Sequence, residues 1–205
     1  MIVDSFLSKD NAEVLIWKMI DDEAFMLDFL QLGPKDLAAY QALKSEKRKR
    51  EYLGVRAALM TILGEYENLE YFESGKPFLK NSDYQISISH TQEWLALIVH
   101  RSKKVGIDIE CKSDKIERLS SRFLGRDEQK YLSGEQLNIA WSAKEALYKI
   151  VGDEAVDFAN QQCLQAFELS SDRGEFEIRH IPTNKMYIGN FILTDSYSLV
   201  YIVSD

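Results

Sequence analysis

The stretch Gly106-Ile107-Asp108-Ile109-Glu110 alternates apolar and acidic side chains, which is the pattern of a β-strand with one buried face. On such a strand Asp108 and Glu110 project from the same face, with their Cα atoms roughly 6–7 Å apart. Two carboxylates at that spacing can share a hard cation that takes oxygen ligands, and Gly106 leaves one side of this surface open. The alternative is an ordinary strand with a solvent-exposed acidic face, because exposed carboxylates are the norm.

The segments on both sides of this strand predict an α+β fold. We expect strands at residues 13–20, 86–89, 94–99, 105–110, 163–169, 175–181, 187–193 and 197–203, and helices at 21–32, 36–63, 115–123, 127–132 and 135–151. Helices that are grouped with meandering strands, without strict βαβ alternation, are typical of this class. The polar turn at residues 101–104 divides the chain almost in half, so the expected halves are residues 1–104 and 105–205.

Composition excludes several classes of protein. The chain has 205 residues, 45% of them hydrophobic, which favours a compact folded protein over a disordered one. Its net charge of −8 repels nucleic acid and anionic membranes, so neither is an expected partner. Cys111 and Cys163 have no Cys or His neighbours at metal-ligand spacing, which indicates free thiols in a reducing compartment. Without a signal-peptide pattern or a run long enough to span a bilayer, the expected location is the cytoplasm.

A second cluster of polar residues lies in the predicted helix at residues 135–151. Helical spacing places Glu145 beside Trp141 and one turn from Lys149. A surface ion pair between Glu145 and Lys149 would account for both residues without any function. Lys144 falls in the middle of the apolar stripe, where a lysine either extends its amine to solvent or points it at an anion.

Three cationic residues of the first half, Arg56, Lys76 and His90, are candidates for binding an anion. Arg56 lies at the margin of an apolar helix face, where a guanidinium usually has a carboxylate or phosphate partner. A structural ion pair, with Glu51 or another acid, is the alternative. Residues 44–56 contain six basic and two acidic side chains, a local charge of +4 in an acidic chain. Together these cations and the three carboxylates predict a Mg²⁺-dependent enzyme that acts on a small molecule carrying several phosphates.

Two motifs resemble a known family. Residues 106–110 (G-I-D-I-E), followed by residues 141–149 (W-x-x-K-E-x-x-x-K), look like the signature pair of the 4′-phosphopantetheinyl transferases. Residues 75–77 (G-K-P) and 88–90 (I-S-H) resemble two upstream motifs of that family, and the likeness extends over residues 47–149. The length of the chain is similar to the surfactin-synthetase-activating type and not to the shorter acyl-carrier-protein-synthase type.

The resemblance implies a fold and an activity. The fold would be a pseudo-dimer of two similar α/β half-domains, with the active site at their interface and a monomer in solution. Residues 1–104 would bind the 3′-phosphate and adenine of coenzyme A, and residues 105–205 would carry the metal-binding and catalytic carboxylates. The enzyme would transfer 4′-phosphopantetheine from coenzyme A to a serine of an apo acyl or peptidyl carrier protein, release adenosine 3′,5′-bisphosphate and require Mg²⁺.

The resemblance also implies roles for individual residues. The ligands of Mg²⁺ would be Asp108, Glu110 and Glu145, and Glu145 would also take the proton of the attacking serine, directly or through a water. Lys149 would neutralise charge on the pyrophosphate, with Lys144 close enough to assist. Arg56 and Lys76 would hold the 3′-phosphate and adenine end of coenzyme A, and His90 would bind a phosphate. Any of Lys44, Lys47 and Arg48 could also reach the 3′-phosphate.

Two other classes of protein are alternatives. A non-catalytic module that binds coenzyme A or a carrier protein would use Arg56, Lys76 and His90. It would not need three converging carboxylates, which are costly near a phosphate unless a cation neutralises them. A Mg²⁺-dependent hydrolase is the second alternative, and it would release free phosphate or free phosphopantetheine.

Overall fold

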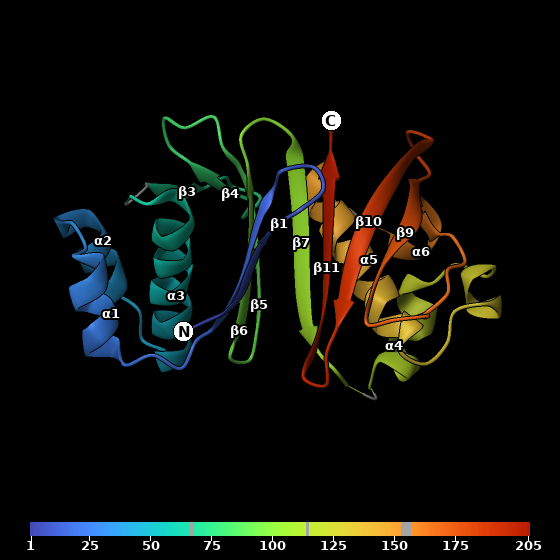
Figure 1. Ribbon diagram of the computed structural model, residues 1–205, viewed down its shortest axis with the longest axis horizontal. Coiled ribbons are helices and arrows are strands. Elements are labelled where there is room, and N and C mark those ends of the chain that lie inside the picture. Colours follow the sequence, from blue (N-terminus) through green and yellow to red (C-terminus); the bar gives the residue numbers. More distant parts are fainter. Residues whose placement is uncertain (66–67, 114, 153–156) are drawn as a thin grey trace. The chain divides into compact units, whose positions relative to one another are not determined.

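The computed structural model describes residues 1–65, 68–113, 115–152 and 157–205 (Figure 1). Within these residues the chain divides into two compact units, Met1–Ser102 and Lys103–Asp205. Each unit has its own antiparallel sheet and its own hydrophobic core. The α+β class predicted from the sequence is confirmed. The predicted likeness of the two halves, and the ligand assigned to each, stay predictions.

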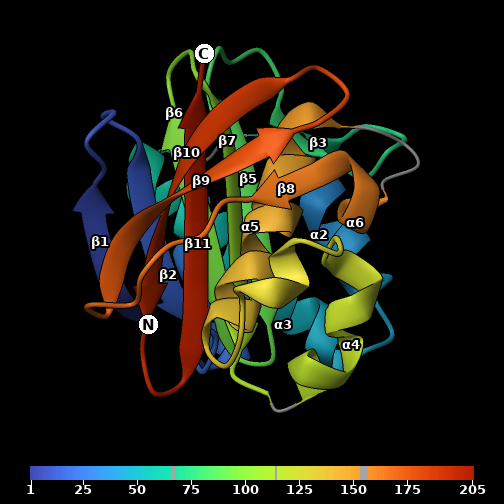
Figure 2. The same cartoon turned by 90° about the vertical axis from the view of Figure 1, so that its right-hand side faces the viewer.

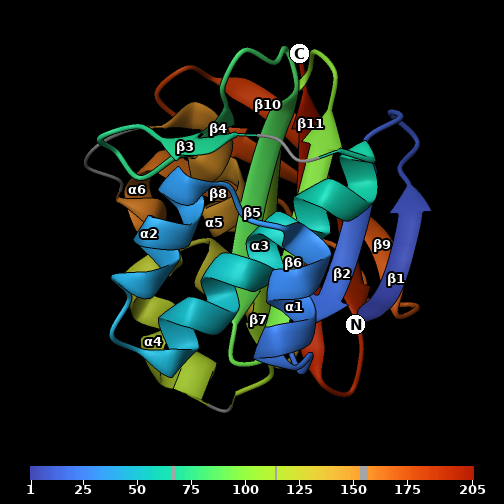
Figure 3. The same ribbon diagram turned by 90° about the vertical axis from the view of Figure 1, so that its left-hand side faces the viewer.

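The first unit contains a four-stranded sheet in the order β1-β2-β6-β5 and a two-stranded sheet of β3 and β4. Its strands are β1 (Ile2–Leu7), β2 (Glu13–Lys18), β3 (Leu69–Tyr71), β4 (Pro77–Leu79), β5 (Gln85–Thr91) and β6 (Trp94–His100), and its helices are α1 (Glu23–Leu30), α2 (Pro34–Gln41) and α3 (Glu46–Leu63). Helix α3 packs against β6 and β2, and α1 packs against α3 (Figure 3). Apolar side chains such as Leu15, Leu59 and Leu97 form the core between them.

The single helix predicted at residues 36–63 is wrong, because the chain forms two helices, α2 and α3. Ser45 has an extended backbone, with φ −101° and ψ 127°, and its carbonyl accepts the N–H of Lys49 at 2.9 Å to begin α3. Serine is a favoured residue at this position, because a helix is more stable with serine just before its first residue than with serine in its interior. The break places Lys44 in the connection and Lys47 and Arg48 in the first turn of α3.

The second unit contains a five-stranded sheet in the order β7-β11-β10-β9-β8. Its elements are β7 (Lys104–Cys111), α4 (Lys115–Phe123), a 3₁₀ turn (Glu128–Lys130), α5 (Gln136–Val151), α6 (Phe158–Gln161), β8 (Gln162–Leu164), β9 (Arg173–His180), β10 (Lys185–Leu193) and β11 (Tyr197–Ser204). Helix α5 packs against β7 and β11 (Figure 2). Its buried residues, among them Ile139, Ala143 and Leu147, join Phe176, Phe191 and other apolar side chains of the sheet in one core.

Some short elements differ from the prediction. Strand β1 was not predicted, because its residues are mostly exposed and it pairs with only one neighbour, β2. Strands β3 and β4 and helix α6 are only three or four residues long, too short for a periodic pattern to show. The strand predicted at residues 163–169 ends at Leu164.

Gly106 allows β7 and α5 to approach each other closely. A Cβ atom at this position would lie 2.0 Å from the backbone oxygen of Ala146 and 3.0 Å from Cγ1 of Ile150. The expectation that Gly106 leaves an open surface is therefore wrong, because the backbone of α5 fills the space. This close contact fixes how the residues of α5 lie relative to those of β7.

We expect Gly106→Ala to lower the free energy of unfolding by about 3 kcal/mol, since the added methyl group meets backbone that must shift. Chemical denaturation measures the loss. Gly33→Ala is the matched control, because Gly33 has φ −64° and a Cβ there has no neighbour within 4 Å. Equal losses in the two variants would show that the contact with α5 is not tight.

None of the helices in the described residues is both long enough and apolar enough to cross a membrane.

Candidate functional site

Three acidic residues of the second unit lie on the paired elements β7 and α5. Asp108, in the middle of β7, is only 4% exposed, while Glu110 near the end of the strand and Glu145 on α5 are half-buried. The alternation of β7 places Asp108 and Glu110 on one face, opposite the fully buried Ile107 and Ile109. The packing of α5 against this strand brings Glu145 into the same region.

Lys149 joins the last turn of α5 to β7. Its amine donates to Oδ1 of Asp108 at 2.9 Å and to the backbone oxygen of Ile107 at 2.6 Å. The sequence allowed a surface ion pair between Lys149 and Glu145 along the helix. In the structure the amine of Lys149 instead donates its hydrogen bonds to β7. Asp108 and Lys149 form a partly buried ion pair that is accessible from the lysine side.

Glu110 accepts a hydrogen bond from an aromatic side chain of α5. The indole N–H of Trp141 donates to Oε1 of Glu110 at 3.3 Å. The indole ring itself packs edge-on against Phe123 and Phe158, with ring centroids 5.4 and 5.8 Å away. Trp141 therefore connects the apolar core of the second unit to the acidic face of β7.

The environment of Glu145 disfavours its charged form. Burial is the main cause that raises the pKa of Glu145, to about 7, and the charge of Asp108 raises it further. The charge of Lys149 lowers this pKa, and that of Glu110 raises it by a smaller amount. The three carboxylates are thus near enough to repel one another.

This donor set fits Mg²⁺ by its chemistry, although the carboxylates do not converge. In the part of the chain that the structure describes, no three Asp, Glu, His or Cys side chains are placed to hold one metal ion. Asp108, Glu110 and Glu145 would have to shift to coordinate an ion together. Their oxygen atoms are the ligands that Mg²⁺ takes, and a cation would relieve the repulsion that raises the pKa of Glu145.

Lys144 points at an anion within its own unit. Its side chain is 0% exposed, and its amine donates to Oε2 of Glu128 at 2.7 Å and to the backbone oxygens of Phe158 and Gln162 at 3.0 and 2.7 Å. These contacts use all three donors of the ammonium group. Burial lowers the pKa of Lys144, and Glu128 opposes this shift. These contacts support a structural role for Lys144 and give no support to the catalytic role predicted for it.

Arg56 of the first unit is also engaged internally. The guanidinium is 6% exposed, donates to Oδ1 of Asp36 at 3.0 Å and lies over the ring of Tyr52 at 3.4 Å. The hydroxyl of Tyr52 donates to the same Oδ1 atom at 2.8 Å. The structural ion pair considered from the sequence therefore exists, with Asp36 as the partner. The Nε atom of Arg56 is buried and has no hydrogen-bond partner among the described residues.

Glu51 contacts three basic side chains. Its carboxylate lies 3.2 Å from Nη1 of Arg48, 3.7 Å from Nζ of Lys47 and 3.4 Å from Nδ1 of His90. Arg48 and Lys47 come from the first turn of α3, whereas His90 comes from β5. Helix α3 thus directs Glu51 toward His90 and Arg56 toward Asp36.

Lys76 lies in the turn between β3 and β4. It is half-buried and follows Gly75, whose φ of +82° lies in the left-handed region that favours glycine. The turn is closed by the N–H of Phe72, which donates to the backbone oxygen of Lys76 at 3.0 Å.

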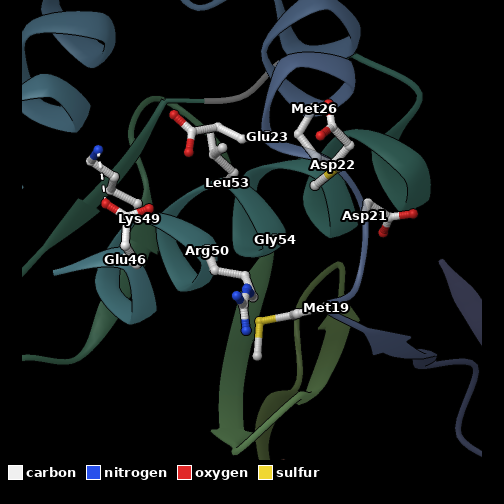
Figure 4. A pocket seen from close by; sticks show the side chains of 10 residues that line it. All are labelled: Met19, Asp21, Asp22, Glu23, Met26, Glu46, Lys49, Arg50, Leu53 and Gly54. Carbon is white, nitrogen blue, oxygen red and sulfur yellow. Dashed lines mark ion pairs between the residues drawn. The ribbon is translucent and has the colours of Figure 1, made fainter.

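A pocket of about 240 Å³ lies in the first unit, between α1, α3 and the end of β2 (Figure 4). Met19, Met26 and Leu53 supply its apolar lining, and charged side chains surround them, including the ion pair of Lys49 with Glu46 at 3.2 Å. The lining contains none of the predicted site residues.

Sequence reasoning missed three acidic residues that hold the predicted site residues in place: Asp36, Glu51 as the partner of His90, and Glu128. Asp36 and Arg56 are 20 residues apart, and Glu128 and Lys144 are 16 residues apart. No local spacing rule links residues at these separations. The one available signal was a basic residue on an apolar helix face, which implies an acidic partner without identifying it.

A half-buried cluster of carboxylates beside a lysine offers the donor types that a divalent cation and a phosphate group take. Residues 104–200 match the family model of the 4′-phosphopantetheinyl transferase superfamily. The match includes Asp108, Glu110, Glu145 and Lys149 and leaves the cations of the first unit outside. No match was found among curated proteins.

Proposed function

We propose that this protein transfers the 4′-phosphopantetheine group of coenzyme A to a serine of an apo acyl or peptidyl carrier protein. The observation that carries the proposal is the cluster of Asp108, Glu145 and Lys149, which lies within the residues that match the superfamily. The surfactin-synthetase-activating type is the branch that we propose, on the resemblance in length and upstream motifs.

In this reaction the serine hydroxyl oxygen attacks the phosphorus that carries the pantetheine arm. A new O–P bond forms as the bond from that phosphorus to the bridging oxygen breaks, and adenosine 3′,5′-bisphosphate leaves with the electron pair. Glu145, directly or through a water, takes the proton from the serine.

The other residues of the cluster would help to neutralise the negative charge of the pyrophosphate. Asp108, Glu110 and Glu145 would hold Mg²⁺, which when bound withdraws negative charge from the pyrophosphate. The amine of Lys149 would neutralise further charge on the pyrophosphate as the bond breaks. Its side chain is partly exposed, so a phosphate oxygen can reach it while Asp108 keeps it oriented.

The cations of the first unit would bind the 3′-phosphate and adenine end. Lys76 and His90 are partly exposed and suit direct contact with an anion. Arg56 donates to Asp36 and to the backbone oxygen of Tyr52 and is only 6% exposed, so it is less available to an anion. We therefore propose Lys76 and His90 as phosphate-binding residues, with Arg56 beside them.

The test is to identify the nucleotide product. The protein is incubated with coenzyme A, Mg²⁺ and an apo carrier protein, and the nucleotides are separated by chromatography. We expect adenosine 3′,5′-bisphosphate in an amount equal to the holo carrier formed, and none when EDTA removes the metal. Coenzyme A binding without any product, across several unrelated carriers, would indicate a binding module. Free phosphate or free phosphopantetheine would indicate a hydrolase.

A further inference from the structure

Glu51 is a buried carboxylate that is surrounded by more positive charge than its single negative charge can neutralise. The residue is 6% exposed, although it lies on the most basic segment of the chain. Arg48, Lys47 and His90 all lie within 4 Å of its oxygen atoms. One negative charge therefore gathers two permanent cations and a histidine at one place on the first unit.

The contact with His90 fixes the histidine ring. A carboxylate on Nδ1 sets the orientation and the tautomer of an imidazole. With Nδ1 directed to Glu51, a contact between His90 and a phosphate falls to Nε2. Arg48 lies on the other oxygen of the same carboxylate, at 3.2 Å, so one side chain contacts both Arg48 and His90.

We propose that Glu51 is a positioning residue that holds His90 and Arg48 for the 3′-phosphate of coenzyme A. The proposal rests on the proposed function, and it selects Arg48 over Lys44 as the α3-side contact of that phosphate. Lys44 precedes α3 and forms no ion pair with the described residues. Arg48, by contrast, shares Glu51 with His90.

Two effects of removing Glu51 have opposite signs. A carboxylate near a phosphate repels it, so its loss would strengthen binding if Glu51 acted by charge alone. If Glu51 acts by orienting His90 and Arg48, its loss weakens binding of the 3′-phosphate. The direction of the change therefore separates the two roles.

The experiment compares coenzyme A with 3′-dephospho-coenzyme A by calorimetry, using the full chain and Mg²⁺. For Glu51→Met, which keeps the size of the side chain and removes its acceptors, we expect the preference for coenzyme A to fall about tenfold, as for loss of hydrogen bonds to a charged group. Affinity for 3′-dephospho-coenzyme A should stay the same. Glu46→Met is the matched control, because Glu46 is an exposed residue of the same helix that pairs with Lys49.

A second variant supports the same test. Glu51→Gln keeps one oxygen acceptor and the shape of the side chain, and should lose a smaller part of the preference. If Glu51→Met does not fold, Glu51→Gln provides the test instead. An unchanged or increased preference in the folded variant, or an equal loss for both ligands, would overturn the proposal. If the unaltered protein itself shows no preference for coenzyme A, the 3′-phosphate site of the proposed function fails instead.

Discussion

Glu145→Gln should lower the rate of phosphopantetheine transfer by about 10²- to 10⁴-fold, the range typical of a lost general base. Glutamine keeps the size of the side chain but cannot accept the serine proton, and it is a weaker metal ligand. Coenzyme A binding should persist, because the cations of the first unit and Lys149 are unchanged. Transfer rates and calorimetric binding constants, measured on the same preparation, check both expectations.

Glu135→Gln is the matched control for this variant. Glu135 is an exposed carboxylate directly before α5 and pairs with Lys112 at 2.5 Å. Its neutralisation should leave transfer nearly unchanged, since an exposed ion pair contributes at most about 1 kcal/mol. If Glu145→Gln turned over coenzyme A at the rate of this control, Glu145 would be neither the base nor an essential ligand.

Lys144→Met should lower the free energy of unfolding by about 3–5 kcal/mol, the usual cost of leaving one member of a buried ion pair alone. Without Lys144, the carboxylate of Glu128 keeps, among the described residues, the N–H groups of Gly125 and Leu164, at 2.7 and 2.8 Å. Two backbone oxygens also lose their donor. Chemical denaturation measures the loss, and transfer per folded molecule should change much less than stability.

Lys130→Met provides the comparison for Lys144. Lys130 pairs with Asp127 at 2.5 Å, but both side chains are exposed, so the expected loss is less than about 1 kcal/mol. A Lys144→Met protein that kept its stability and lost transfer would restore the catalytic role predicted from the sequence. Equal stability losses for the two variants would show that burial of the Lys144 pair has no special cost.

Periodicity predicted the long elements of the fold and failed at the short ones. Strand β7 and helix α5 were predicted because their patterns repeat over several residues, and both occur nearly where expected. The break at Ser45 was missed because residues 44–51 are all polar or charged, so no apolar pattern marks where one helix ends and the next begins. The closed space at Gly106 could not be predicted, since it depends on where the backbone of Ala146 passes.

The candidate site was predictable in its residue types and less so in its contacts. The i, i+2 spacing on β7 and the motif on α5 singled out Asp108 and Glu145, which do influence each other in the structure. Which acid each cation contacts was not predictable. The ion pair considered as the alternative for Arg56, with Glu51 or another acid, is formed with Asp36, while Glu51 contacts His90. Pairings of this kind depend on tertiary packing and leave no local pattern.

The central claim is that the protein modifies a carrier protein with part of coenzyme A. The most direct measurement is the intact mass of an apo carrier protein after incubation with this protein, coenzyme A and Mg²⁺, with EDTA in a parallel sample. The account predicts a gain of one phosphopantetheine that depends on Mg²⁺ and is absent with Glu145→Gln. An unchanged mass across several unrelated apo carriers, despite measurable binding of coenzyme A, would contradict it.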